Sequence, residues 1–159
     1  TVDLQKLALR AMSVMKDRSK TDKTVHKVTG DTAIDRSGSL FKSADIFNIL
    51  VVDDEAALCE LSAIWLTSIG YEVATADGPM QALEYLAKER YCCLFTDIVM
   101  PGGMDGIELA KKAVLLQPHL RVLLTSGYAE RLLEDNDLHG EVLSKPYRKT
   151  DLIHALNRL

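Results

Sequence analysis

Two adjacent aspartates, Asp53 and Asp54, stand where an apolar run ends, in the stretch ILVVDDE at residues 49–55. Adjacent carboxylates repel each other, and keeping both ionised costs free energy unless something positive lies between them. Further along the chain, Asp97 ends a second apolar run, YCCLFT at 91–96. Three carboxylates in one small hollow suit a hard divalent cation, above all Mg²⁺ when phosphate supplies other ligands. The aspartates therefore predict a Mg²⁺ site, provided that the fold brings their segments together.

A hydroxyl and an amine end two further apolar runs, since Thr125 closes LRVLLT and Lys145 follows EVLS. A carboxylate can attack phosphorus and form an aspartyl phosphate, whose oxygens must then be neutralised and oriented. Mg²⁺, the Lys145 ammonium and the Thr125 hydroxyl are suited to that work, which is what phosphoryl transfer requires of a protein. Together these residues predict a phosphoryl-transfer site with a carboxylate nucleophile.

Each of these residues also has an ordinary structural explanation. Asp53 or Asp54 can simply cap the helix that follows, although capping does not need both. Asp97 before a Pro-Gly loop is typical of a turn, and a lysine before proline is typical of a solvated charge. The joint placement of these groups at four strand ends is what favours the chemical interpretation.

Strand-length apolar runs alternate with helical patterns from residue 45 onwards. The sequence predicts strands over 46–52, 71–76, 91–96, 120–125 and 141–144. It predicts helices over 56–69, from Pro79, over 105–116, over 128–137 and, capped by Thr150, at the C-terminal end. Runs that are apolar on both faces require a parallel sheet covered on both sides. In such doubly wound sheets, ligands bind beyond the carboxyl ends of the strands, where the candidate site residues are expected.

Apolar spacing also predicts which helix faces are buried. The predicted inner residues are Leu58, Leu61, Ile64, Trp65 and Ile69 in the first helix, and Met80, Leu83, Leu86 and Ala87 in the second.

The first 44 residues differ in composition from the rest. They hold nine Lys and Arg against five Asp and Glu, whereas residues 45–159 hold ten against eighteen. Residues 3–16 place apolar groups at helical spacing, and residues 17–45 are rich in Ser, Thr, Asp and Lys without periodicity, as linkers are. We therefore predict an N-terminal amphipathic helix and polar linker over 1–44 and one α/β domain over 45–159.

The bulk composition excludes several classes of protein. The chain is 47% hydrophobic and 26% charged, as in globular proteins, and no run approaches the roughly 20 apolar residues of a membrane helix. Cys59, Cys92 and Cys93 are an odd set with two adjacent members, a poor disulfide framework. We expect a cytoplasmic chain without membrane insertion. Direct nucleic-acid binding is not expected, because the basic N-terminal segment has no recognition motif and no interleaved aromatic residues.

Four stretches of the predicted domain resemble the receiver domain of bacterial response regulators. They are ILVVDDE (49–55), FTDIVMPGGMDGIELA (95–110), VLLTSGYA (122–129) and LSKPY (143–147). The resemblance covers residues 45–159 and implies a five-stranded, (βα)5 flavodoxin-like fold with strand order 2-1-3-4-5, counted within the domain.

The resemblance also implies a role for each site residue. Asp97 would be the phosphoacceptor, Thr125 would bind the phosphoryl group when the domain switches, and Lys145 would pair with it. The Mg²⁺ ligands would be Asp53, Asp54, Asp97 and the backbone carbonyl of Val99. Pro146 is expected to follow a cis peptide bond, which X–Pro bonds allow at modest cost.

Two departures from the family pattern concern the switch and the acceptor loop. Where the family often has an aromatic residue three positions before the lysine, this chain has Val142. Tyr128 can take over as the moving aromatic, or it can be an ordinary half-exposed tyrosine. MPGGMDG is one residue longer than the commoner pattern, which predicts a longer loop with Gly102 and Gly103 in unusual conformations. VLLTSGYA and PGGMDG most resemble receivers attached to hybrid sensor kinases.

By this resemblance the chain is a switch in a two-component phosphorelay. A sensor histidine kinase or histidine phosphotransfer protein would phosphorylate Asp97, and water would remove the group. The chain would then not be an enzyme, beyond phosphorylating and dephosphorylating itself; if it is cut from a hybrid sensor, the parent would be a histidine kinase. Residues 3–16 can be the tail of such a kinase, or a contact for docking or homodimerisation.

Two alternatives use similar chemistry or the same fold. A Mg²⁺-dependent phosphohydrolase of the haloacid-dehalogenase type would need a second Asp two positions after the nucleophile, as acid and base, and that position is Val99. A phosphorylation-independent interaction module would keep the fold without needing the site residues, all of which are present.

Overall fold

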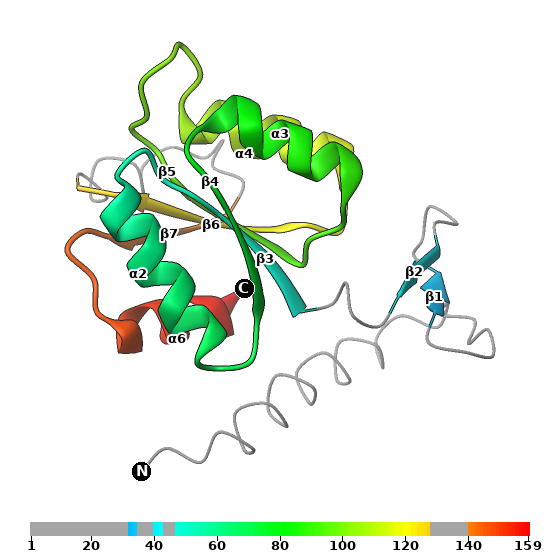
Figure 1. Cartoon of the computed structure of the whole chain (residues 1–159), viewed down its shortest axis with the longest axis horizontal. Helices are drawn as coiled ribbons and strands as arrows, with labels where there is room; N and C mark the ends of the chain where they lie inside the picture. Colours follow the sequence, from blue (N-terminus) through cyan, green and yellow to red (C-terminus); the bar gives the residue numbers. More distant parts are fainter. Residues whose placement is uncertain (1–31, 35–39, 43–46, 128–139) are drawn as a thin grey trace.

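The computed structural model describes residues 32–34, 40–42, 47–127 and 140–159 (Figure 1). The helices expected over 3–16 and 128–137 lie outside these residues. Among the described residues, no helix has the length and apolarity that crossing a membrane requires.

Five parallel strands form the central sheet. They are β3 (Asn48–Val52), β4 (Glu72–Ala76), β5 (Cys93–Asp97), β6 (Arg121–Ser126) and β7 (Glu141–Ser144). Their order in space is β4-β3-β5-β6-β7, which counted within the domain is the expected 2-1-3-4-5. The predicted doubly wound α/β fold is confirmed.

Helices cover both faces of this sheet (Figure 1). They are α2 (Ala56–Thr67), α3 (Pro79–Lys88), α4 (Gly106–Leu116) and α6 (Lys149–Arg158). Successive strand residues point to opposite faces, so Ile49 and Val51 pack in one cluster with α2 and α6. Leu50 and Val52 pack in the other with α3 and α4. This explains why β3 is apolar at four consecutive positions, 49–52.

The buried face of α2 differs from the expected one. Leu61 and Ile64 are exposed, Ile64 to 62%, whereas Cys59, Ser62 and Leu66 are buried. Residues advance by about 100° around a helix, so Leu61 and Ile64 lie on the side away from the sheet. The expectation followed the large apolar side chains, whereas the face that packs on the sheet uses a small thiol and a small hydroxyl.

The buried face of α3 was also predicted wrongly at two positions. Met80 is 66% exposed and Ala87 is exposed, whereas Ala82 and Leu86 are buried. Met80 and Ala87 lie about a quarter of a turn from the row of buried residues. The small Ala82 allows the helix to approach the sheet, and size alone did not identify it.

The start of α6 differs from the prediction that Thr150 caps it. The helix begins at Lys149, and the backbone N–H of Arg148 donates to the carboxylate of Asp151 at 2.8 Å. A carboxylate at the third helical position satisfies the exposed N–H of the residue before the helix, so a threonine cap is not needed.

A short antiparallel pair, β1 (Thr32–Ile34) and β2 (Leu40–Lys42), lies in the segment for which the sequence predicted only a polar linker. Strands of three residues are too short for the period-of-two pattern that identifies strands, which explains why they were missed.

Gly106, the first residue of α4, is in close contact with the backbone at the end of β5. Its N–H donates to the carbonyl oxygen of Ile98 at 2.9 Å, and a Cβ at this position would lie 2.0 Å from the carbonyl oxygen of Asp97. No side chain fits there without moving one of the two elements.

We expect Gly106→Ala to lower the free energy of unfolding by about 1–3 kcal/mol, the usual cost of overpacking. Gly78→Ser is the matched control, because a Cβ there meets nothing within 4 Å and serine is a good N-cap. Urea denaturation measures both. Equal stability of the two variants would contradict the close approach.

Candidate functional site

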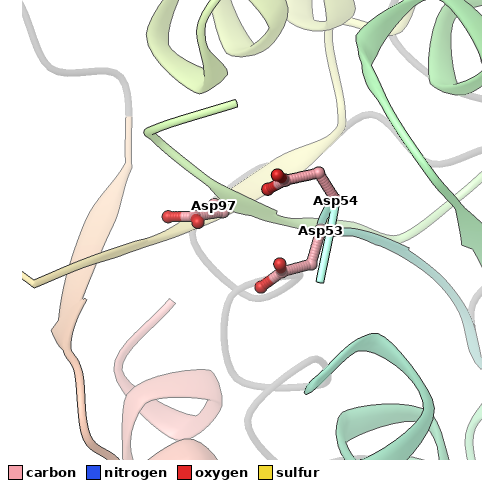
Figure 2. Close-up of side chains that lie close together, drawn as sticks. All are labelled: Asp53, Asp54 and Asp97. Carbon is pink, nitrogen blue, oxygen red and sulfur yellow. The ribbon is translucent and has the colours of Figure 1, made fainter. Parts of the chain in front are cut away.

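The three aspartates meet at one edge of the sheet (Figure 2). Asp53 and Asp54 follow β3, and Asp97 is the last residue of the neighbouring β5. The register aligns Val52 with Thr96, so the residues after them stand side by side. One carboxylate oxygen from each aspartate lies within 4.8 Å of those from the other two. The sheet therefore gathers the predicted acidic cluster.

The donor set of this cluster fits a hard cation. It consists only of carboxylate oxygens, which Mg²⁺ prefers and keeps together with several waters. Asp53 and Asp97 are buried, whereas Asp54 is exposed, so these carboxylates would hold a cation from both the interior and the solvent side. A hollow of about 520 Å³, lined in part by Asp53, Asp54 and Asp77, opens beside the cluster and offers room for water.

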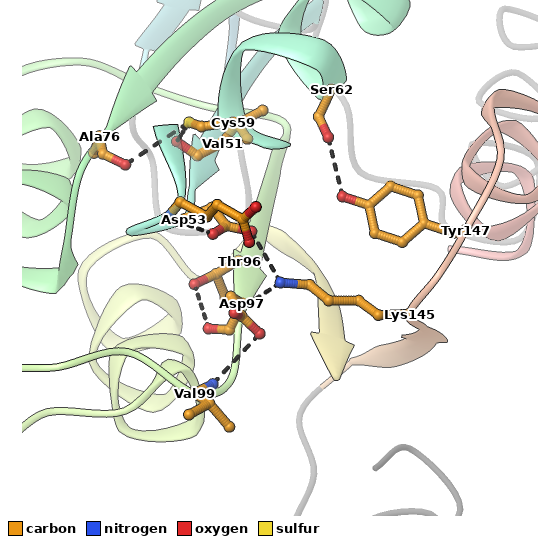
Figure 3. Close-up of polar contacts among 11 residues, drawn as sticks. Val51, Asp53, Cys59, Ser62, Ala76, Thr96, Asp97, Val99, Lys145 and Tyr147 are labelled. Carbon is orange, nitrogen blue, oxygen red and sulfur yellow. Dashed lines mark hydrogen bonds and ion pairs between the residues drawn. The ribbon is translucent and has the colours of Figure 1, made fainter. Parts of the chain in front are cut away.

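Lys145 supplies positive charge inside the acidic cluster (Figure 3). Its Nζ lies 3.1 Å from Asp53 Oδ2 and 2.8 Å from Asp97 Oδ2. Burial lowers the pKa of Lys145, but the hydrogen bonds to Asp97 and Asp53 outweigh it and raise that pKa above its usual value. The lysine is therefore charged at neutral pH, as an ion pair with both carboxylates requires.

Strand register places Thr125 beside Asp97. Thr125 is buried on β6 and is aligned with Asp97 on β5, and its carbonyl oxygen accepts from the N–H of Ile98 at 2.9 Å. Val99, in the loop after β5, donates its N–H to Asp97 Oδ1 at 3.4 Å. The expected role of the Val99 carbonyl as a metal ligand stays a prediction.

The remaining predicted residues have different outcomes. The bond between Lys145 and Pro146 is cis, as expected. Gly102 and Gly103 both have positive φ angles, of 105° and 87°, which fits the expected unusual loop. Val142 is half-buried and packs with Ile98, Ala110, Val122 and Leu124; its role in switching stays a prediction. Tyr128 lies outside the described residues.

Ser62 and Tyr147 have no role predicted from the sequence. The structure places the Tyr147 hydroxyl 3.0 Å from the Ser62 hydroxyl, although 85 residues separate them. The one available signal was that Ser62 lies three residues after Cys59 and four before Leu66, on the inward row of its helix. Apolar periodicity does not identify a buried serine, so its position gave no prediction of burial.

The family model of the response regulator receiver domain matches residues 49–157. The chain therefore belongs to the receiver domains of two-component response regulators, a family in which phosphorylation on aspartate is typical. These domains act as signalling switches and generally bind Mg²⁺ at an acidic pocket.

Individual relatives agree with this assignment. The response regulator receiver protein CpdR of Brucella abortus is 36% identical over 114 residues, which cover 70% of this chain and 94% of CpdR. Two other curated relatives match over less of their own length. The match covers 19% of the transcriptional regulatory protein ZraR of Klebsiella oxytoca and 65% of the sporulation initiation phosphotransferase F of Bacillus subtilis.

Two solved structures share the fold. TrrA of Thermotoga maritima, solved with Mg²⁺ and BeF, has a TM-score of 0.63 at 28% identity, over 70% of this chain and 96% of TrrA. The receiver domain of the hybrid histidine kinase CckA has a TM-score of 0.60 at 31% identity, over the same shares.

We expect Asp54→Asn to weaken Mg²⁺ binding on the order of tenfold or more, since even residues that only orient metal ligands contribute that much elsewhere. Asp77→Asn is the control, because Asp77 lines the same hollow but does not belong to the three-aspartate cluster. Mg²⁺ that binds the native state must also raise the melting temperature. Calorimetric titration and thermal melts measure both effects, and equal affinities of the two variants would contradict the site.

Proposed function

We propose that the chain is a phosphorelay switch that accepts its phosphoryl group on Asp97, with Mg²⁺ as cofactor. The observation that carries this assignment is the position of Asp97 between site groups. β3 brings Asp53 and Asp54 to one side and β6 brings Thr125 to the other, while Lys145 contacts the Asp97 carboxylate directly. Asp53 is less suited as acceptor, because its Oδ1 accepts the N–H of Glu55 at 2.9 Å, whereas the corresponding contact of Asp97 Oδ1, with the N–H of Val99, is longer at 3.4 Å.

The proposed transfer is a displacement at phosphorus. A carboxylate oxygen of Asp97 attacks the phosphorus of a phosphohistidine, the new O–P bond forms and the N–P bond breaks, and the imidazole leaves and takes up a proton. Mg²⁺ held by the three aspartates would supply positive charge to the phosphoryl oxygens.

The added charge of about −1.5 to −2 then changes the partners of Lys145 and Thr125. Lys145 moves from the carboxylates to the phosphoryl oxygens, and the Thr125 hydroxyl binds the same group. The surfaces around β6 and β7 repack, so that the populations of two states shift. Hydrolysis of the acyl phosphate by water resets the domain.

Receiver domains generally interact with histidine kinases or phosphotransfer proteins. We infer that the donor here is a sensor histidine kinase or histidine phosphotransfer protein in the cytoplasm. The likeness to the CckA receiver, with VLLTSGYA and PGGMDG, supports a receiver of the hybrid-kinase type. A boundary near residue 45 agrees with the start of the family match at residue 49.

The phosphohydrolase alternative lacks its second acid. Val99, which stands where that acid would be, has an apolar side chain that is 67% exposed and cannot protonate a leaving group. An interaction module that needs no phosphate remains as the competing hypothesis, and the next experiment separates the two.

Incubation with acetyl phosphate and Mg²⁺ should add one phosphoryl group to the full chain, seen by intact mass. We expect Asp97→Asn to abolish the increment, because the nucleophilic oxygen is lost, and removal of Mg²⁺ with a chelator to do the same. Asp77→Asn should retain it. Retention of the label by Asp97→Asn would refute the acceptor assignment, and failure of the unmodified chain to take up phosphate or beryllofluoride would favour the interaction module.

A further inference from the structure

Tyr147 connects the segment that carries Lys145 to helix α2. It lies two residues after Lys145, and its hydroxyl is 3.0 Å from the hydroxyl of Ser62 (Figure 3). Ser62 lies on the inward face of α2, which begins just after Asp53 and Asp54. Helix α2 therefore follows Asp53 and Asp54 closely in the chain and also contacts the segment that carries Lys145.

The Tyr147 ring is also held on two sides. It makes edge-on contacts with Phe95, at 5.9 Å between ring centroids, and with Trp65, at 6.4 Å. Phe95 lies on β5, two residues before Asp97, and Trp65 lies on α2. Burial raises the pKa of the Tyr147 phenol, so it stays protonated at neutral pH and can share a hydrogen bond with Ser62.

The burial of Ser62 is not explained by packing alone. Only 2% of this residue is exposed, and a buried hydroxyl costs free energy unless it is hydrogen-bonded. Alanine would pack at this position without that cost. A hydroxyl here is useful because the Tyr147 hydroxyl lies within reach, 3.0 Å away.

The segment 145–148 is thus anchored at both ends. At its start, the N–H of Lys145 donates to the carbonyl oxygen of Ser126 on β6 at 2.9 Å. Near its end, the Tyr147 hydroxyl is hydrogen-bonded to Ser62 of α2. Helix α6 begins two residues later, at Lys149. With both anchors in place, the Lys145 side chain extends toward Asp97 rather than toward solvent.

We propose that the hydrogen bond between Tyr147 and Ser62 positions Lys145 to bind the phosphoryl group on Asp97. Tyr147 and Ser62 are positioning residues, because they act through Lys145 and do not touch the reacting atoms. The inference rests on the proposed function of Asp97 and adds two residues that determine how well the phosphorylated state is held.

Beryllofluoride, which imitates the phosphoryl group, provides the test. Its affinity for the full chain with Mg²⁺ is measured by calorimetry in the unmodified protein, Tyr147→Phe, Ser62→Ala and the double variant. Loss of one hydrogen bond of typical net strength corresponds to about 3- to 10-fold, and we expect each single variant to lose that much. The double variant should lose no more than a single one, because both remove the same bond.

Mg²⁺ affinity distinguishes positioning from general damage. Lys145 meets the phosphoryl group, whereas the aspartates hold the metal, so the variants should bind Mg²⁺ as tightly as the unmodified chain, or more tightly. A misplaced α2 would instead lower the affinities for beryllofluoride and for Mg²⁺ together. Tyr91→Phe is the matched control, since it removes another buried tyrosine's hydrogen bond, 3.4 Å to Glu89, on the other face of the sheet.

Unchanged beryllofluoride affinity in Tyr147→Phe and Ser62→Ala would overturn this inference but leave the proposed function standing. A parallel loss of Mg²⁺ affinity would do the same. Failure of the unmodified chain to bind beryllofluoride would overturn the proposed function, and this inference with it. If Tyr147→Phe does not fold, Ser62→Ala, which keeps every ring, carries the same comparison.

Discussion

Repulsion among three clustered carboxylates is the constraint on which the rest of the structure depends. Asp53, Asp54 and Asp97 lie within reach of one small cation, and within the part of the chain that the structure describes one ammonium, that of Lys145, pairs with two of them. The cluster therefore keeps an excess of negative charge, which favours cation binding. The backbone ladder between β3 and β5 holds the charges together at the cost of some stability.

The parallel sheet is what makes this arrangement possible. All its strands end at the same edge, so residues far apart in the sequence become neighbours without any long loop reaching across. Apolar clusters on both faces fix the register, because a slip of one residue would exchange Leu50 and Val51 between faces. The precision of the site therefore derives from packing some distance away from it.

The sequence allowed the fold and the polar edge to be predicted because the relevant signals are local. Continuous apolar strands and the residue types that end them indicated Asp97 and Lys145 as candidate site residues. Contacts that depend on exact helix rotation were not predictable: Leu61, an apolar residue at helical spacing, faces solvent, while Ser62 beside it is buried. The bond from Ser62 to Tyr147 joins segments 85 residues apart, and nothing in either segment alone indicates it.

The edge-on contact between Tyr147 and Trp65 has a practical consequence. The chain contains a single tryptophan, and it lies 6.4 Å from a ring two residues beyond Lys145. Indole emission responds to the aromatic and polar groups around it, so a rearrangement of the lysine segment changes the light that this one residue emits. Trp65 is thus an intrinsic fluorescent probe, and conformational changes of the lysine segment can be followed in real time without an added dye.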